Sequence, residues 1–361
     1  MRVLHLSAGA MWGGVERLLV TLARERGYAS DMHPHFAVCF RERLSQELRM
    51  AGSPVDYLGE VRTSRPLTVL RARKALRTLL LQEKMDVGVC HLPWAHAIFA
   101  PVLREAKVPA VFWMHGFATG RHWTELWARL SPPALVIANS QATAKTAPAL
   151  FPGTPAQVLF NPVSMEAEPR AELPGTIVQV SRMEPWKGHR LHLEALALLK
   201  NEPGWRCRIV GGAQTNAEIS YVLSLRKRAR LLGIEDRVEF MGQRSDVEVQ
   251  LAEASIFCQP NTGPEPFGIV FIEALAAGVP VVTTALGAAP EIIDDSCGIL
   301  TEPGNAASLA AALKLLLNDA ALRQRLGESG KQRAAALCSP ERQMPALALL
   351  LRKVTLGGQV K

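Results

Sequence analysis

Short apolar segments alternate with stretches of helical periodicity along nearly all of this 361-residue chain. Each apolar segment is rich in Val, Leu and Ile, and most are followed by a stretch in which apolar residues recur every three or four positions. The segments lie at 2–7, 35–40, 55–58, 87–91, 110–115, 135–139, 157–160, 176–181, 206–210, 237–241, 255–259, 279–283 and 298–300. Strands that alternate with helices build parallel sheets from βαβ units. The chain therefore predicts an α/β fold.

One polar stretch interrupts this alternation. Residues 161–175 read NPVSMEAEPRAELPG and carry no periodic apolar pattern, which is typical of a linker. A new strand begins directly after it. Because the chain length suits two domains of ordinary size, we expect two Rossmann-like domains, at 1–162 and 163–339, followed by a last helix within 340–361.

Composition narrows the class of protein. The six cysteines lie far apart without a Cys-x-x-Cys pair, which indicates free thiols in a reducing compartment and neither a disulfide framework nor a zinc site. The apolar part of residues 1–14 is too short for a signal peptide, and Glu273 and Pro280 interrupt the most apolar stretch, 269–289. We therefore expect a cytoplasmic protein without a membrane span.

Positive charge is concentrated in the first half of the chain. Residues 1–162 contain 19 Lys and Arg against 11 Asp and Glu, whereas residues 163–361 contain 22 of each. This asymmetry indicates that the first half faces an anionic surface or acceptor. We expect no nucleic-acid partner.

A basic amphipathic helix within 65–82 carries much of this charge. Its apolar positions cluster on one side, and Arg71, Arg73, Lys74 and Arg77 are predicted on the other, with no acid between Glu60 and Glu83. Two interpretations stay open. The helix packs on the core with a solvated basic face, or it docks through residues 62–84 on the inner face of an anionic cell membrane.

Two carboxylates flank a predicted helix start in GPEPFGIVFIEALAAGVPVV, residues 263–282. Pro266 disfavours helix at Glu265, and helical spacing begins after Gly268, so Glu265 is expected in a loop and Glu273 within the first two helical turns. The unpaired N–H groups of a helix start favour phosphate. The flanking acids are better suited to sugar hydroxyls, although solvated surface glutamates would give the same pattern.

Other candidate residues follow predicted strands. Arg182 and Lys187 stand five residues apart in a turn after strand 176–181, a spacing that suits a diphosphate. Gly13 and Gly14 precede a helix and would let backbone amides approach a phosphate. His115 ends strand 110–115, at the sheet edge where parallel-sheet enzymes bind ligands, although a lone histidine is more often structural.

These motifs resemble the retaining glycosyltransferases of family 4, strongly over 175–300 and more loosely over 1–160. EPFGIVFIEALAAGVPVV is similar to the donor-site motif of that family, SRMEPWKG to its pyrophosphate motif, and GGVERLLVTLA to its first loop and helix. The resemblance implies the GT-B fold, in which two Rossmann-like domains face a central cleft and the terminal helix crosses back to the first domain.

The resemblance also implies roles for individual residues. Glu265 would contact the transferred sugar and Glu273 the nucleotide ribose, with Phe267 and Gly268 between them. Arg182 and Lys187 would hold the diphosphate, and His115 would lie near the donor sugar and the acceptor.

The function expected from this resemblance is retaining transfer of a sugar from a UDP- or GDP-linked donor to a saccharide or lipid-linked acceptor, in cell-envelope or polysaccharide biosynthesis. Because the sequence contains no Asp-x-Asp motif to hold a metal–diphosphate complex, we expect no metal and no cofactor. The alternatives are a nucleotide-sugar epimerase of the same fold and a non-catalytic sugar-nucleotide-binding or membrane scaffold.

Overall fold

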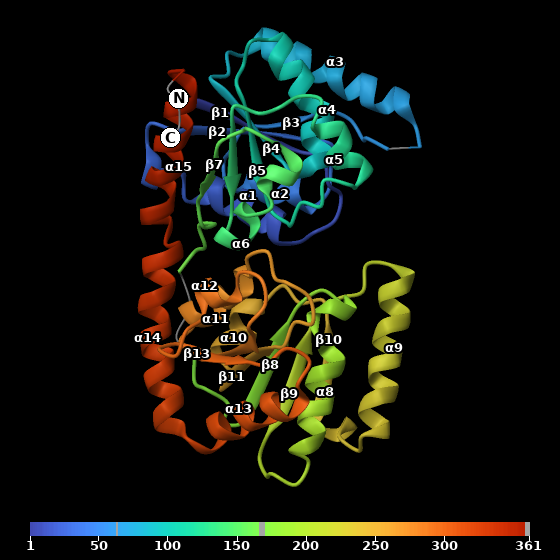
Figure 1. Ribbon diagram of the computed structural model, residues 1–361, viewed down its shortest axis with the longest axis vertical. Coiled ribbons are helices and arrows are strands. Elements are labelled where there is room, and N and C mark those ends of the chain that lie inside the picture. Colours follow the sequence, from blue (N-terminus) through green and yellow to red (C-terminus); the bar gives the residue numbers. More distant parts are fainter. Residues whose placement is uncertain (63, 166–169, 358–361) are drawn as a thin grey trace. The chain divides into compact units, whose positions relative to one another are not determined.

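The computed structural model describes residues 1–62, 64–165 and 170–357 (Figure 1). The chain forms two compact units, of which the first contains Met1–Ser164 and Cys338–Lys361 and the second contains Met165–Leu337. The division lies two residues beyond the expected 162/163 boundary. Residues 166–169 of the expected linker and Thr63 of the basic segment lie outside the described residues.

The first unit is built on a seven-stranded parallel sheet in the order β3-β2-β1-β4-β5-β6-β7. Its strands are β1 (Arg2–Ser7), β2 (His33–Val38), β3 (Val55–Tyr57), β4 (Val87–His91), β5 (Ala110–Met114), β6 (Leu135–Ala138) and β7 (Ala156–Val158). Strands such as β4 and β6 are buried along their whole length, because helices cover both faces of the sheet. The strand order reverses between β1 and β4.

The helices of the first unit include one from the far end of the chain. They are α1 (Gly14–Arg24), η1 (Arg26–Ala29), α2 (Arg43–Met50), α3 (Pro66–Gln82), α4 (Leu92–Glu105), α5 (Trp123–Ala128), α6 (Gln141–Ala144), α7 (Ala147–Leu150) and α15 (Pro340–Thr355). Helix α15 completes the core on one sheet face, where Met344, Leu347 and Leu351 are fully buried together with residues of α1. Helices α3 and α4 contribute to the core on the other face.

The second unit contains a six-stranded parallel sheet in the order β10-β9-β8-β11-β12-β13. Its strands are β8 (Thr176–Val180), β9 (Arg206–Val210), β10 (Val238–Gly242), β11 (Ile256–Gln259), β12 (Val281–Thr284) and β13 (Gly298–Thr301). Its helices are η2 (Pro185–Lys187), α8 (His189–Leu198), α9 (Asn216–Leu231), η3 (Glu235–Arg237), α10 (Val247–Ala252), α11 (Ile269–Ala276), α12 (Ala289–Ile292), α13 (Ala306–Asn318) and α14 (Ala320–Cys338). The strand order reverses between β8 and β11, and ligands of open parallel sheets bind at the carboxyl ends of the strands beside such a reversal.

The predicted α/β fold is confirmed, and every predicted strand is present. One part of the basic helix was predicted wrongly. Arg73 does not lie on a solvated face of α3, because it is half-buried and donates from Nε and Nη2 to the carbonyl oxygens of Ile98 (2.8 Å) and Ala97 (3.1 Å). Arg77 is exposed and forms a bidentate ion pair with Glu105.

Candidate functional site

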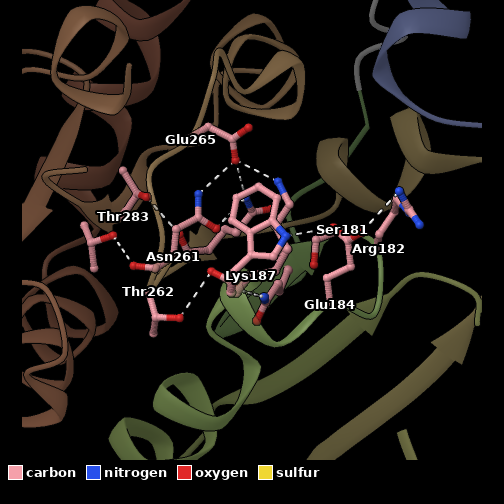
Figure 2. Close-up of polar contacts among 12 residues, drawn as sticks. Ser181, Arg182, Glu184, Lys187, Asn261, Thr262, Glu265 and Thr283 are labelled. Carbon is pink, nitrogen blue, oxygen red and sulfur yellow. Dashed lines mark hydrogen bonds and ion pairs between the residues drawn. The ribbon is translucent and has the colours of Figure 1, made fainter. Parts of the chain in front are cut away.

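The carboxyl ends of β8 and β11 bring together several of the predicted residues. Arg182 and Lys187 follow β8, and Glu265 follows β11, so that all three lie beside the strand-order reversal of the second sheet. Figure 2 shows the polar contacts that join the two segments. The candidate site of the second unit is therefore formed by the loops that a parallel sheet uses for ligands.

Glu265 is the buried centre of this network. Its side chain is only 7% exposed, and its Oε2 accepts hydrogen bonds from Lys187 Nζ at 2.7 Å, Asn261 Nδ2 at 2.9 Å and Gln259 Nε2 at 3.4 Å. In Figure 2 the second carboxylate oxygen is turned away from these donors. A carboxylate held so firmly through one oxygen can offer the other to a ligand hydroxyl.

Lys187 was predicted to meet a diphosphate, and in the structure its ammonium is paired with Glu265 and lies 3.9 Å from the centroid of the Trp186 ring. The residue ends the short helix η2, and its carbonyl oxygen accepts a hydrogen bond from Gln179 Nε2 at 2.9 Å. An ammonium has three N–H donors, so the ion pair with Glu265 uses part of its capacity. Lys187 is thus held in one place with its charge largely desolvated.

Two glycines allow the loops to approach this closely. Gly188 has a φ of +76°, and a Cβ there would lie 1.7 Å from the carbonyl oxygen of Pro260. Gly287 has a φ of +64°, and a Cβ there would lie 2.3 Å from the carbonyl oxygen of Glu265. Since only glycine fits these positions, they fix the Lys187 turn against the end of β11 and the Glu265 backbone against the loop after β12.

Arg182 is fixed by two acids. Its guanidinium pairs with Glu184 at 3.2 Å and with Glu218, on α9, at 3.1 Å. Burial alone would raise the pKa of Glu218, but hydrogen bonds from the Gln214 N–H and from Arg182, together with the Arg182 charge, hold the pKa below its ordinary value. The two acids therefore hold the Arg182 guanidinium in position beside the end of β8.

The other residues of the predicted motif lie around α11. Gly268 is the N-cap of this helix with a φ of +88°, and Phe267 is buried beside it. Glu273 lies within α11, as predicted, and is half-buried. A glycine N-cap has no side chain to accept the first helical N–H groups, so this end of α11 suits an anion.

In the first unit, His115 follows β5 and is hydrogen-bonded to another histidine. Its Nε2 lies 2.9 Å from Nδ1 of His91, whose Nε2 lies 3.1 Å from Nδ1 of His5. Gly13 is the N-cap of α1 and Gly14 its first residue. The carboxylate of buried Glu16 lies 3.5 Å from the position of a Cβ on Gly13, so this helix start already faces a negative charge. A phosphate-binding role for the two glycines stays a prediction.

Two family models match adjoining parts of the chain. Residues 12–167 match the model described as Glycosyltransferase Family 4, and residues 162–333 match the model described as Glycosyl transferases group 1. The chain belongs to glycosyltransferase family 4. It is a glycosyltransferase, and its two parallel-sheet units form the GT-B fold.

Two relatives of this glycosyltransferase, a phosphotransferase and a mannosyltransferase, show how similar known sequences are to it. An exopolysaccharide phosphotransferase of Streptomyces coelicolor is 36% identical over 168 residues, which are 45% of this chain and 17% of the relative. A phosphatidyl-myo-inositol mannosyltransferase of Mycobacterium leprae is 29% identical over 297 residues, which are 77% of this chain and 76% of the relative. The crystal structure of Anabaena HepE in complex with UDP-glucose has a TM-score of 0.85 at 23% identity, with 98% of this chain and 100% of that one covered.

Several residues of the candidate site were not predicted. Asn261 and Gln259 hold Glu265, and Gln179 joins the Lys187 carbonyl to Nδ1 of His192. Their signal in the sequence is a polar residue at or near the end of an otherwise apolar strand, as in SIFCQPN. In a buried parallel strand such a residue needs a polar partner, which a ligand loop can provide.

All six cysteines are free and buried. Among the described residues of the glycosyltransferase, no helix has the length and apolarity that crossing a bilayer requires.

Proposed function

We propose that the second unit binds a nucleotide-sugar and that the enzyme transfers the sugar to a saccharide or lipid-linked acceptor with retention of anomeric configuration. The observation that carries this proposal is the buried Glu265–Lys187 pair beside α11. A carboxylate suits sugar hydroxyls, and the ammonium and helix start suit a diphosphate. UDP and UDP-glucose, present in the Anabaena HepE structures, support a nucleoside diphosphate as the carrier.

In the proposed reaction the bond between the sugar C1 and the diphosphate oxygen breaks, the oxygen of the acceptor hydroxyl bonds to C1 on the same face, and the hydroxyl proton passes to the departing diphosphate oxygen. Negative charge then grows on the diphosphate. Lys187 and Arg182 would stabilise this charge through positions that are already fixed, which avoids reorganisation during the reaction. Glu265 would orient the sugar, and Glu273 would bind the ribose, which does not react.

The decisive experiment is a screen of UDP- and GDP-sugars for slow hydrolysis, followed by mass spectrometry of the products with candidate acceptors. The anomeric configuration of the product, read by NMR, tests retention. An epimerase would return an isomerised nucleotide-sugar, and a non-catalytic scaffold would bind donors without turnover. Either result would replace the proposed transfer.

We also propose that the enzyme is cytoplasmic and docks on the anionic inner face of the cell membrane through α3. This helix exposes Leu67 (65%), Leu70 (56%) and Leu81 (88%), and the exposed cations Arg71 and Lys74 lie among them. Leucines interspersed with cations, without an acid on the helix, suit the boundary between lipid headgroups and acyl chains. A saccharide or lipid-linked acceptor at that surface fits the basic first half of the chain.

Sedimentation with vesicles tests this docking. Binding to vesicles with anionic lipid is expected to exceed binding to neutral vesicles and to weaken as salt rises. Replacing both Arg71 and Lys74 by Gln should weaken it about tenfold to thirtyfold, at roughly 1 kcal/mol per cation. The matched control replaces two exposed cations of α9, Lys227 and Arg230, by Gln. Equal losses in the two double variants would reject α3 as the docking element.

A further inference from the structure

Three histidines form a diagonal line across the first sheet. His5 on β1 is level with Val89 of β4, His91 lies two residues further along β4, and Trp113 of β5 is level with His91. His115 lies two residues beyond Trp113. Since side chains two apart on a strand share a face, all three imidazoles lie on one side of the sheet. Their ring nitrogens meet in the two contacts of 3.1 and 2.9 Å described above.

All three imidazoles are neutral near pH 7. Burial lowers the pKa of His5 and of His115 to about 3, and burial together with the neighbouring rings of His115 and His5 lowers that of His91 well below its ordinary value. Three neutral rings carry three N–H protons, and each N···N contact needs one of them. The third proton must then lie at an end of the line, on His5 Nε2 or on His115 Nδ1.

The two ends differ in their surroundings. His5 Nε2 is buried and has no hydrogen-bond partner in the part of the chain that the structure describes, whereas His115 is half-buried at the sheet edge. A buried N–H without an acceptor is rarer in folded proteins than an unused acceptor. An unpaired buried N–H is avoided when His5 Nε2 carries no proton. His5 then donates from Nδ1 to His91 Nε2, and His91 donates from Nδ1 to His115 Nε2. The third proton lies on His115 Nδ1.

The backbone beside the middle histidine is strained. Leu92, which follows His91 at the carboxyl end of β4, has a φ of +72°. A leucine in the left-handed region is unusual, and such residues cluster at functional sites, where the surrounding structure holds them in place. The strain thus lies at the first residue of α4, directly after His91.

We propose that His91 is a positioning residue that locks His115 in its Nδ1–H tautomer, with His5 as the buried end that sets the direction of the line. This rests on the proposed function insofar as His115 then donates from Nδ1 to a substrate hydroxyl oxygen. His5 Nε2 has no hydrogen-bond partner among the described residues that could take up or supply a proton. The three histidines therefore fix the tautomer of His115 and do not relay protons. His115 is accordingly a hydrogen-bond donor and not the base of the reaction.

The first test needs no substrate. In protein labelled with ¹⁵N-histidine and free of ligand, the nitrogen shifts of His115 should show a single Nδ1–H tautomer that stays neutral down to about pH 4. An Nε2–H tautomer in the wild-type protein would overturn the proposal, even if His115 proves essential for transfer. Conversely, a correct tautomer with no effect of His115→Ala on transfer would reject only the role of His115 in the reaction.

Variants then distinguish a role of His91 in fixing the His115 tautomer from a role in packing alone. His91→Phe removes the donor to His115, so both tautomers should appear and kcat should fall roughly tenfold, as when a histidine loses its orienting partner, with the donor KM within about twofold. His91→Asn can still donate an amide N–H to His115 Nε2 and should restore much of the loss. His5→Phe makes His91 Nε2 the buried end without a partner. The same preference for an unused acceptor over an unpaired N–H then keeps the direction of the line, so the His115 spectrum should keep the Nδ1–H form. His96, buried elsewhere in this unit against the Ser131 carbonyl, provides the control variant His96→Phe. If His91→Phe keeps a single Nδ1–H form, or if its loss of kcat matches that of His91→Asn, the lock is rejected.

Discussion

Replacing Glu265 by Gln should strengthen binding of a nucleoside diphosphate while it lowers turnover. Lys187 Nζ lies 2.7 Å from Glu265 Oε2, and a phosphate oxygen bound to the same ammonium would lie about 2.8 Å from it. The two negative oxygens would then be at most about 5.5 Å apart. Their repulsion is about 3 kcal/mol at an effective dielectric constant of 20 and about 0.8 kcal/mol in water.

Because the Glu265 side chain is 7% exposed and the ligand approaches from solvent, the relief of repulsion lies between these limits. We expect about 1.4 kcal/mol, which is a tenfold tighter Kd. Glutamine keeps the shape of the side chain and an oxygen that can accept from Asn261 and Lys187. Its lost charge weakens the contact with the transferred sugar, so kcat should fall even though the nucleotide binds more tightly.

Calorimetric titration of UDP and GDP into wild-type and Glu265→Gln protein measures this difference, with thermal melts to verify folding. The matched control is Glu253→Gln, which removes the carboxylate of another ion pair in the same unit, with Arg208 at 2.8 Å. Its affinity for nucleoside diphosphate should equal that of the wild type. Weaker binding by the folded Glu265→Gln variant would refute the placement of the diphosphate on Lys187.

Three further predictions concern the ribose, metal and acid. Glu273→Ala should weaken binding of donor and of free nucleoside diphosphate by the same factor, since it is assigned to a part of the donor that does not react; a change in kcat alone, by steady-state kinetics, would contradict this. Turnover should persist in excess chelator, because fixed cations are assigned to the diphosphate; a strict requirement for added magnesium or manganese would reject that assignment. Burial lowers the pKa of His5, His115 and His192 to about 3 and of His96 and His189 to about 4. Below pH 6.5 the unfolded chain therefore binds protons that the folded chain does not, and the free energy of unfolding should fall by up to about 1.4 kcal/mol per pH unit for each. Melting temperatures should be constant above about pH 7 and should drop between pH 6.5 and 4. A melting temperature that stays constant down to pH 5 would contradict the lowered pKa values of these histidines.

The sequence alone predicts the strands and the motif residues because their signals are local. Apolar runs, Pro266 and Gly268 each restrict the backbone within a few residues, so the start of α11 could be predicted. The pairing of Lys187 with Glu265 could not, since the two residues are 78 positions apart and meet only through the strand order.

Contacts between side chains on different strands could not be predicted from the sequence either. His5 and His91 look like ordinary members of apolar strands, and their line to His115 depends on the register between β1, β4 and β5. Arg73 was assigned to the solvated face because a helical wheel gives the direction of a side chain but not its length. Its long side chain reaches back to the carbonyl groups at the middle of α4.

The contribution of α15 to the first unit has a consequence for biosynthesis. Residues 165–337 form one uninterrupted unit, whereas the first unit needs Met344, Leu347 and Leu351 to close its core. During synthesis on the ribosome, residues 1–164 therefore emerge with an apolar sheet face that stays uncovered until α15 is made, after the whole second unit. The usual order, in which the amino-terminal domain folds first, is reversed at the final step. The second unit can therefore finish folding before the first, which is completed only when α15 has left the ribosome.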